Sequence, residues 1–321
     1  MTQIIRGLQQ VRPSHRGCVA TIGNFDGVHS GHIAILNALK RHARQRQSPA
    51  CVILFEPQPL EYLYPDQAPV RLTRLRDKLD LLQQQNIDQI LILRFDAVLA
   101  VCTAAQFIQM VLVEQLGVAH LLIGDDFRFG RDRQGDFALL QQAGAEHGFS
   151  VASLETVESA GIRISSTRIR AALAAGDMAT AARCLGRNYV LSGRVCRGAQ
   201  RGRTWGFPTL NLRPVKHNCP LHGVFLVRVV GPEEVCWDGV ANVGRRPTVE
   251  SAAALLLEVH LLDVTVDLYG VQVQVQFRQR LRAEQKFASF DALKAQIARD
   301  VHQARQLLAA AVTCSPISVP G

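Results

Sequence analysis

Two histidines at a glycine-rich turn are the first candidates for chemistry in this 321-residue chain. Residues 23–32 read Gly-Asn-Phe-Asp-Gly-Val-His-Ser-Gly-His, which sets His29 and His32 three positions apart. An apolar run at 18–22 predicts a strand before this turn, and the apolar spacing at 33–39 predicts a helix after it. The first turn of a helix presents unpaired backbone N–H groups, and glycine lets the backbone approach a ligand closely. The corner therefore suits the phosphates of a nucleotide.

A second candidate segment follows the fifth predicted strand and opens a helix. Residues 164–170 read Ile-Ser-Ser-Thr-Arg-Ile-Arg, and their three adjacent hydroxyls can cap a helix and donate to phosphate oxygens. Arg168 can clamp a phosphate with two parallel hydrogen bonds. An ordinary helix cap would explain this segment alone, but beside the histidine turn we expect it to bind phosphate.

Two carboxylates, Asp125 and Asp126, follow the fourth predicted strand. They could hold Mg²⁺ or accept hydrogen bonds from a polar ligand, while Phe127 and Phe129 could contact an aromatic ligand or pack in the core. No serine or cysteine nucleophile stands beside a positioned base in these segments. Cationic and donor groups dominate, which favours nucleotidyl transfer: the acceptor's own phosphate attacks, and the histidines neutralise the transition state and the leaving pyrophosphate.

The C-terminal half holds its own polar groups. A Gly/Arg-rich loop at 193–206 leads into a short strand in which Thr209 and Asn211 face the same side and could hold Mg²⁺ with nucleotide phosphates. Glu258 and His260 share one face of the apolar run 255–262. A carboxylate there could be a general base for a substrate hydroxyl, or the face could simply meet solvent. Both interpretations of the strand stay open at this point.

The elements that must position these residues divide the chain into two domains. Residues 18–175 alternate strand and helix patterns, which predicts a Rossmann-like parallel sheet with helices on both faces, and ligands then lie beyond the carboxyl ends of the strands. After residue 186 short strands separated by Gly and Pro predict an antiparallel β-barrel with a C-terminal helix at 290–308. The fold class is therefore α/β followed by β. The predicted domains are 1–186 and 187–312, with a loose tail at 313–321.

Charge and cysteine content narrow the function classes. Residues 1–186 hold 19 Lys+Arg and 17 Asp+Glu, whereas residues 187–321 hold 17 and 10. The basic half could meet nucleic acid, but aromatic residues are few, and a small phosphorylated ligand is favoured. Eight cysteines lie too far apart for a metal site or redox pair.

The sequence shows no signal peptide and no membrane span, so we expect a cytoplasmic protein. We expect neither a nucleic-acid partner nor a membrane partner. The oligomeric state stays open.

In order along the chain, these motifs resemble the bacterial bifunctional riboflavin kinase/FMN adenylyltransferase family, also called FAD synthetase. The resemblance covers roughly residues 17–308 and includes the segments 72–78, 239–248, 267–270 and 282–287. It implies that a C-terminal barrel converts riboflavin and ATP to FMN and ADP. It also implies that the N-terminal domain converts FMN and ATP to FAD and pyrophosphate, both steps with Mg²⁺.

The resemblance also implies roles for individual residues, by their numbers in this sequence. One departure is Gln58, which stands where many members carry His, and it is given no catalytic role. The implied catalytic residues are His29, His32, Arg168 and Glu258. The implied ATP-binding residues of the adenylyltransferase are Gly23, Asn24, Asp26, Gly31, Ser165, Ser166 and Thr167, and those implied to bind flavin are Asp126, Arg128 and Arg282. The implied kinase Mg-ATP residues are Gly198, Gly206, Pro208, Thr209 and Asn211, with Thr209 and Asn211 on the Mg²⁺.

Two other hypotheses remain from the sequence. One is a nucleotidyltransferase of the same histidine class that acts on another acceptor and uses its basic barrel to bind RNA. The other is a non-catalytic regulator that binds flavin or nucleotide, which would be expected to lose groups such as His29 or Glu258.

Overall fold

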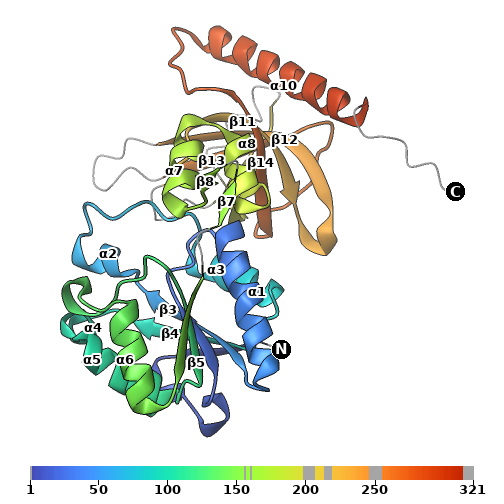
Figure 1. Ribbon diagram of the computed structural model, residues 1–321. Coiled ribbons are helices and arrows are strands. Elements are labelled where there is room, and N and C mark those ends of the chain that lie inside the picture. The colour runs from blue at the N-terminus through green and yellow to red at the C-terminus, as the bar shows by residue number, and fades with distance from the viewer. Residues whose placement is uncertain are drawn as a thin grey trace, which may run out of the picture. The chain divides into compact units, whose positions relative to one another are not determined.

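The computed structural model describes residues 2–154, 157–159, 161–197, 207–212, 219–245 and 255–313. The chain forms two units, Met1–Ser166 and Thr167–Gly321 (Figure 1). The predicted positions Gly198 and Gly206 lie outside the described residues, as does Trp205.

The first unit is built on a parallel sheet of six strands in the order β1-β4-β3-β2-β5-β6. Strand β2 is central and ends immediately before the histidine turn. Because ligands bind beyond the carboxyl ends of parallel strands, this turn lies at the expected edge. The strands are β1 (Gln3–Arg6), β2 (Val19–Ile22), β3 (Ala50–Glu56), β4 (Gln89–Arg94), β5 (His120–Gly124) and β6 (Ser150–Leu154).

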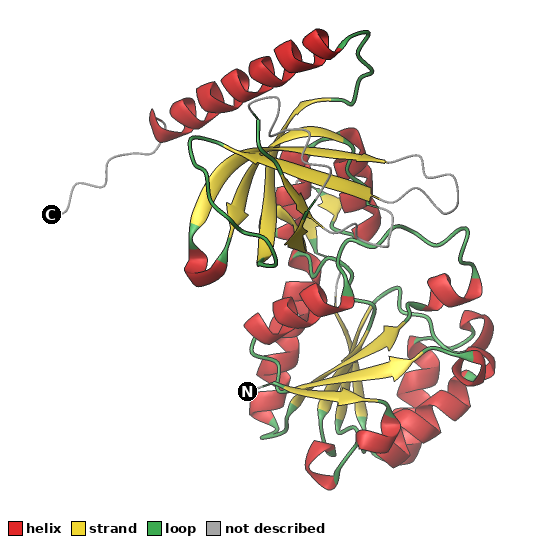
Figure 2. Cartoon of the chain, turned by 180° about the vertical axis from the view of Figure 1, so that it is seen from behind, coloured by secondary structure: helices red, strands yellow, loops and turns green. Residues whose placement is uncertain are grey.

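Alternate residues of these strands enter two hydrophobic cores. Val19 and Val52 pack with the helices α1 (Ser30–Gln45) and α3 (Leu75–Gln84) on one face. Ala20 and Ile53 pack on the other face with α5 (Ala104–Phe107), the π-helix Ile108–Gln115 and α6 (Phe137–His147). Helices thus cover both faces of the sheet, as predicted, and Figure 2 shows this layering.

Three local features differ from the sequence-based expectation. Strand β1 was not predicted, because four residues with one buried side chain give no clear pattern. The amphipathic stretch 104–116, one of the helix patterns within residues 18–175, divides into α5 and the π-helix. Short elements absent from the prediction are α2 (Pro59–Leu63), α4 (Ala97–Val101) and the pair β7 (Glu158–Ser159) and β8 (Ile162–Arg163).

The second unit begins with two helices and continues as a closed antiparallel barrel. The helices are α7 (Ser166–Ala175, which begins at the last residue of the first unit) and α8 (Met178–Leu185). The strands follow the order β10-β13-β12-β11-β14-β9 and close on themselves. The barrel therefore has the predicted class. Its strands are β9 (Tyr189–Cys196), β10 (Leu210–Leu212), β11 (Gly223–Val230), β12 (Cys236–Arg245), β13 (Leu255–Leu261) and β14 (Gln272–Arg282).

A long C-terminal helix, α10 (Phe290–Thr313), packs on the outside of this barrel. Its Val301 and Ala304 form an apolar cluster with Val224 and Val240 of the barrel. The neighbouring strand residues alternate to the interior, where Phe225 meets Phe277 edge to face at 5.4 Å. The face that carries residues 224 and 240 is therefore the outer one.

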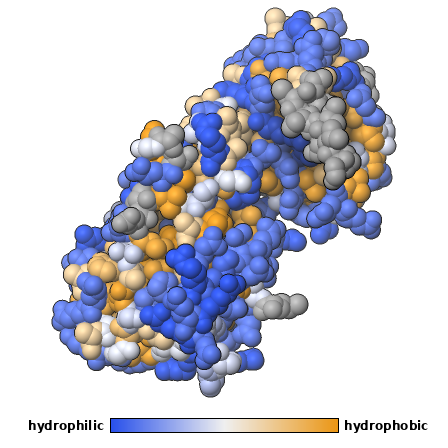
Figure 3. All heavy atoms as spheres, turned by 45° about the vertical axis from the view of Figure 1, so that its right-hand side comes forward, coloured by the Kyte–Doolittle hydropathy of each residue, from blue (hydrophilic) through white to orange (hydrophobic). Residues whose placement is uncertain are grey.

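Polar and apolar side chains both lie on the surface. Figure 3 shows polar side chains over much of one face with apolar side chains exposed between them. Val98 of α4, 74% exposed, is the most exposed large apolar side chain described. None of the described helices combines the length and apolar character that a membrane span needs.

Candidate active sites

The histidine turn begins helix α1 with an unusual reciprocal cap. The backbone N–H of His32 donates to Nδ1 of His29 at 3.2 Å, and the backbone N–H of His29 donates to Nδ1 of His32 at 3.4 Å. The two rings stack with centroids 3.6 Å apart. Because each Nδ1 accepts a hydrogen bond, each neutral ring carries its proton on Nε2. The cap thus fixes the tautomer of both histidines.

Gly31 lies where a side chain would crowd the ring of His29. A Cβ at position 31 would meet Nδ1 of His29 at 3.1 Å and its Cε1 at 3.2 Å. A side chain there would displace the ring of His29, which is 6% exposed. The glycine between the two histidines therefore lets their rings approach.

A pocket of about 250 Å³ opens beside the histidines. It collects predicted residues from three separate segments, since Ser165 and Ser166 lie directly before and at the start of α7, and Asp126 follows β5. Gly23, Asn24, Asp26 and Arg128 are not among the lining residues of this pocket. Those that line it include His29, Gly31, His32, Asp126, Arg163, Ser165 and Ser166.

The carboxylates after β5 face a cation that sequence reasoning did not single out. Arg163 of β8 pairs with Asp126 and lies 3.9 Å from Asp125. Arg128, a predicted flavin residue, instead pairs with Asp136 at 3.0 Å, the residue that caps α6. Thr167 and Arg168 lie in the first turn of α7 and belong to the second unit.

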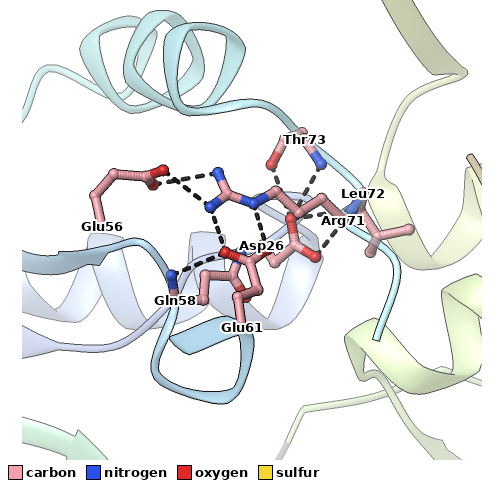
Figure 4. Close-up of polar contacts among 7 residues, drawn as sticks. All are labelled: Asp26, Glu56, Gln58, Glu61, Arg71, Leu72 and Thr73. Carbon is pink, nitrogen blue, oxygen red and sulfur yellow. Dashed lines mark hydrogen bonds and ion pairs between the residues drawn. The ribbon is translucent and has the colours of Figure 1, made fainter. Parts of the chain in front are cut away.

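A buried ion-pair network was also missed. The side chain of Arg71, 7% exposed, pairs with Glu56 at 2.9 Å and with Glu61 (Figure 4). Burial opposes the charged form of Arg71, but the hydrogen bonds that its guanidinium donates to Glu61 and Glu56 outweigh burial and raise the pKa of Arg71. The network ties the end of β3 to α2, where Gln58 is the cap residue. The only signal in the sequence was the charge of these residues, which a surface position explains equally well.

In the barrel, strand pairing brings two predicted kinase residues together. Asn211 of β10 is the direct partner of Glu258 of β13, and Glu258 is also the partner of Asn242 of β12. Directly opposed residues of an antiparallel pair share a face. Leu257 and Val259 are buried, so Glu258 projects to the outer face, and Asn211 and Asn242 lie beside it.

His260, two residues along β13, holds the segment before β10. Its Nδ1 donates to the carbonyl of Pro208 at 2.9 Å, and its ring meets Phe207 edge to face at 5.4 Å. Nδ2 of Asn211 donates to the carbonyl of Thr209 at 3.5 Å. These contacts connect the segment 207–211 to the strand of Glu258, and a pocket of about 150 Å³ opens beside Pro208 and Thr209.

Arg282, predicted to contact flavin, lies at the end of β14 and is tied to α10. It forms a bidentate pair with Asp300, whose side chain is 4% exposed, with nitrogen–oxygen distances of 2.9 to 3.1 Å. Gln296 donates to the same carboxylate at 2.8 Å, and the guanidinium lies 5.7 Å from the ring centre of Phe287. In this structure Arg282 fixes the helix to the barrel.

Comparison with known proteins matches a different family to each part of the chain. Residues 11–168 match the family model of FAD synthetase, and residues 185–308 match that of riboflavin kinase. The bifunctional riboflavin kinase/FMN adenylyltransferase of Escherichia coli strain K12 is 51% identical over 305 residues, 95% of this chain and 97% of that protein. The chain belongs to the bifunctional riboflavin kinase/FMN adenylyltransferase family.

One more relative and one solved structure are also similar to this chain. The one from Pseudomonas fluorescens is 49% identical over 307 residues, 96% of this chain and 98% of that protein. A crystal structure described as a macrolide-efflux protein from Streptococcus pneumoniae is 28% identical, with a TM-score of 0.81 over 95% of this chain and 98% of that one.

Family membership confirms the predicted function, a bifunctional transferase of flavin cofactor biosynthesis, and the predicted fold of both units. It decides against the alternatives of a different nucleotidyl acceptor and of a non-catalytic regulator. The roles of individual residues are a separate question.

Proposed function

We propose that the chain makes FAD in two steps at two separate sites. Residues 187–312 phosphorylate riboflavin with ATP, and residues 1–186 adenylylate the resulting FMN with a second ATP. The family models support this assignment because they match residues 185–308 and 11–168 respectively. The segment 313–321, predicted as a tail, lies outside the described residues except for Thr313, the last residue of α10.

Adenylyl transfer takes place at the pocket beside His29 and His32. A phosphate oxygen of FMN attacks the α-phosphorus of ATP, and the bond to the β-phosphate breaks to release pyrophosphate. The reciprocal cap supports a donor role for both histidines, since it leaves the Nε2–H of each ring as its proton donor. Donors aimed at developing negative charge stabilise the transition state.

Further groups hold the two substrates of this step. Ser165 donates its hydroxyl to the ATP phosphates from the pocket wall, and Ser166, whose own hydroxyl donates to the carbonyl of Asp26, binds them through its backbone N–H. Thr167 and Arg168 follow on the first turn of α7. Gly23, Asn24 and Gly31 bring the backbone close to ATP. Asp126 and Arg128 contact the flavin, for which Asp126 has the more favourable place because it lines the pocket.

In the barrel, Glu258 removes the proton of the riboflavin 5′-hydroxyl, and that oxygen attacks the γ-phosphorus of ATP to release ADP. The direct pairing of Asn211 with Glu258 supports this site, since it brings base and nucleotide together. Gly198, Gly206 and Pro208 contact the nucleotide from the adjoining segment, and Arg282 contacts the flavin.

Both steps use Mg²⁺, which neutralises phosphate charge when it is bound. Mg²⁺ prefers oxygen ligands and keeps phosphate and water ligands in nucleotide sites. Because Nδ2 of Asn211 donates to the carbonyl of Thr209, its Oδ1 is the end available to a cation. Asn211 and the hydroxyl of Thr209 therefore fit the ion in the kinase site.

The observation that carries this proposal is that predicted residues gather at one place in each unit. His29, His32, Asp126, Ser165 and Ser166 line one pocket of the first unit, and Asn211 pairs with Glu258 in the barrel of the second. The test is to incubate the chain with riboflavin, ATP and Mg²⁺ and to separate the flavins by chromatography. FMN and then FAD should form. Absence of both products would contradict the proposal.

Two substitutions test whether the sites are separate. His32→Ala should stop FAD formation and leave FMN formation intact. Glu258→Ala should stop FMN formation and leave FAD formation from added FMN intact. Loss of both activities in either folded variant would rule out independent sites.

A further inference from the structure

The turn that leads into the histidines holds its backbone in left-handed conformations. Phe25, Gly27 and Val28 have φ angles of 46°, 85° and 40°. Glycine adopts such angles freely, but a β-branched valine does so only where its surroundings impose them. Something outside the turn must therefore hold residues 25–28 in place.

The side chain of Asp26 supplies the first part of this hold (Figure 4). Its carboxylate accepts the backbone N–H of Leu72 at 2.9 Å, the backbone N–H of Thr73 at 3.0 Å and the hydroxyl of Thr73 at 3.1 Å. The hydroxyl of Thr73 in turn accepts the backbone N–H of Gly27 at 3.0 Å. Asp26 is 3% exposed and Thr73 is 9% exposed, so these bonds are shielded from water. We call Asp26 and Thr73 with these bonds the turn clamp.

Two further contacts complete the hold. The side chains of Phe25 and Val28, 2% and 1% exposed, pack in the core with Leu36 and Leu39 of α1. The hydroxyl of Ser166 donates to the backbone carbonyl of Asp26 at 2.9 Å. The turn is thus fixed by its side chains on one side and by hydrogen bonds on the other.

A buried lysine of the neighbouring helix α3 is also influenced by Asp26. Lys78 of α3 is fully buried, and its Nζ has no hydrogen-bond partner among the described residues. Burial lowers the pKa of Lys78, and the charge of Asp26 is the strongest influence in the opposite direction. The carboxylate of Asp26 is thus engaged within the protein both by hydrogen bonds and by charge.

We propose that Asp26 and Thr73 are positioning residues of adenylyl transfer, which act through the turn 25–28 to hold His29 and His32 at the pocket. This proposal rests on the proposed function of the N-terminal unit, and it replaces the sequence-based expectation that Asp26 binds ATP. A carboxylate that already accepts several buried hydrogen bonds is poorly suited to contact phosphate, which repels it.

The test is a set of variants in the full-length chain. Thr73→Val removes the hydroxyl and keeps the shape, Thr73→Ser keeps the hydroxyl, and Asp26→Asn removes the charge. Asp80→Asn, on the exposed side of α3, is the matched control. For each variant kcat and the KM for ATP are measured in FMN adenylylation, with riboflavin phosphorylation measured in the same preparation.

We expect kcat of adenylylation to fall roughly 10- to 100-fold in Thr73→Val, because displacement of catalytic groups by about 1 Å has effects of this size. Its KM for ATP should stay within about threefold, Thr73→Ser should recover most of kcat, and riboflavin phosphorylation should be unchanged. Asp26→Asn should resemble Thr73→Val. If Asp26→Asn does not fold because Lys78 loses its counter-charge, the two Thr73 variants still decide.

Three results would overturn the positioning role: an unchanged kcat in Thr73→Val, a rise in KM for ATP without a fall in kcat, or a parallel loss of both activities. Failure of Thr73→Ser to recover kcat would also contradict it, since the hydroxyl would not be the group that matters. An unsubstituted chain that makes no FAD from FMN contradicts the proposed function itself. An active unsubstituted chain with a fully active Thr73→Val variant contradicts the clamp alone.

Discussion

The histidine turn and the pair Glu258–Asn211 are held in place by different kinds of structure. His29 and His32 follow a turn with left-handed residues, which buried side-chain hydrogen bonds keep in position. Glu258 and Asn211 lie on regular strands, and the ladder of the barrel sets them opposite one another. A turn depends on a few specific side chains, whereas a ladder spreads the same task over many backbone hydrogen bonds. Substitutions beside the turn should therefore affect its chemistry more than substitutions beside the strand pair.

The largest effect that would sharpen this comparison is expected at Glu258 itself. Glu258→Gln should lower kcat of riboflavin phosphorylation roughly 10²- to 10⁴-fold, because it removes the proposed general base and leaves the ladder intact. Glu258→Asp should lie between this variant and the unsubstituted chain, since the strand cannot shift to bring the shorter carboxylate nearer. Steady-state kinetics measure both. Equal activity of the Asp and Gln variants would show that activity does not depend on the distance from the carboxylate to the substrate hydroxyl, and hence not on the position that the ladder gives the carboxylate.

The next effect concerns stability near the turn. Arg71→Met should destabilise the first unit by about 3 kcal/mol, because it leaves the carboxylates of Glu56 and Glu61 partly buried without their partner. The free energy of unfolding in denaturant measures this, with the exposed Arg76→Met of α3 as the control. A change below about 1 kcal/mol would mean that solvent already screens the network.

A pH-dependent loss of stability, no larger than that expected for Arg71→Met, is expected at the amino end of the parallel sheet, where β5 begins. His120, 3% exposed, stacks on His42 at 4.6 Å, and burial, followed by the charge of Arg46, lowers its pKa to about 4. The unfolded chain then binds the proton more tightly. Stability should fall as pH falls from about 6.5 to 4, by up to roughly 3 kcal/mol from this group.

Unfolding measured across this pH range in His120→Gln should show a weaker dependence on pH. His147→Gln, at an exposed position of α6, should retain the full dependence. The same slope in both variants would assign the acid sensitivity to other groups. His120 begins β5, whereas the histidine turn follows the opposite end of the neighbouring strand β2. At pH values where the protein stays folded, the adenylylation activity of His120→Gln should therefore equal that of the unsubstituted chain.

The smallest effect tests the barrel side of the comparison. His260→Phe keeps the ring contact with Phe207 but loses the hydrogen bond to Pro208. One hydrogen bond contributes about 1 kcal/mol, so the KM for ATP in riboflavin phosphorylation should rise about fivefold with little change in kcat. His260→Asn, which keeps a donor, should recover part of it. A large fall in kcat would show that the segment 207–211 depends on side chains as strongly as the turn does.

Sequence periodicity predicted much of this fold because buried faces repeat at fixed intervals. The strand around Ala20 and the helix that follows the histidine turn stand where apolar spacing placed them. Residues adjacent in one motif, such as His29 and His32, were also found, since short spacing fixes their geometry. These features depend only on local order along the chain.

Contacts between distant segments could not be predicted in the same way. Asp26 and Thr73 are 47 positions apart, and so are Asn211 and Glu258. Alternation along a strand shows which face Glu258 occupies, but not which residue of which strand lies opposite. Arg71 and Lys78 are charged residue types, which usually lie at the surface, so the sequence did not indicate that they are buried. The parts of each site that depend on such contacts were therefore visible only in the structure.

The register of β10 against β13 has a consequence for folding fidelity. A slip by one residue would turn Glu258 from the outer face into the barrel interior and bring an apolar side chain to the outside. An unpaired carboxylate in that interior would be strongly unfavourable. Glu258, the proposed base of the kinase, thus also disfavours the misaligned barrel. A barrel that closes in the correct register therefore also has its proposed kinase residues in place.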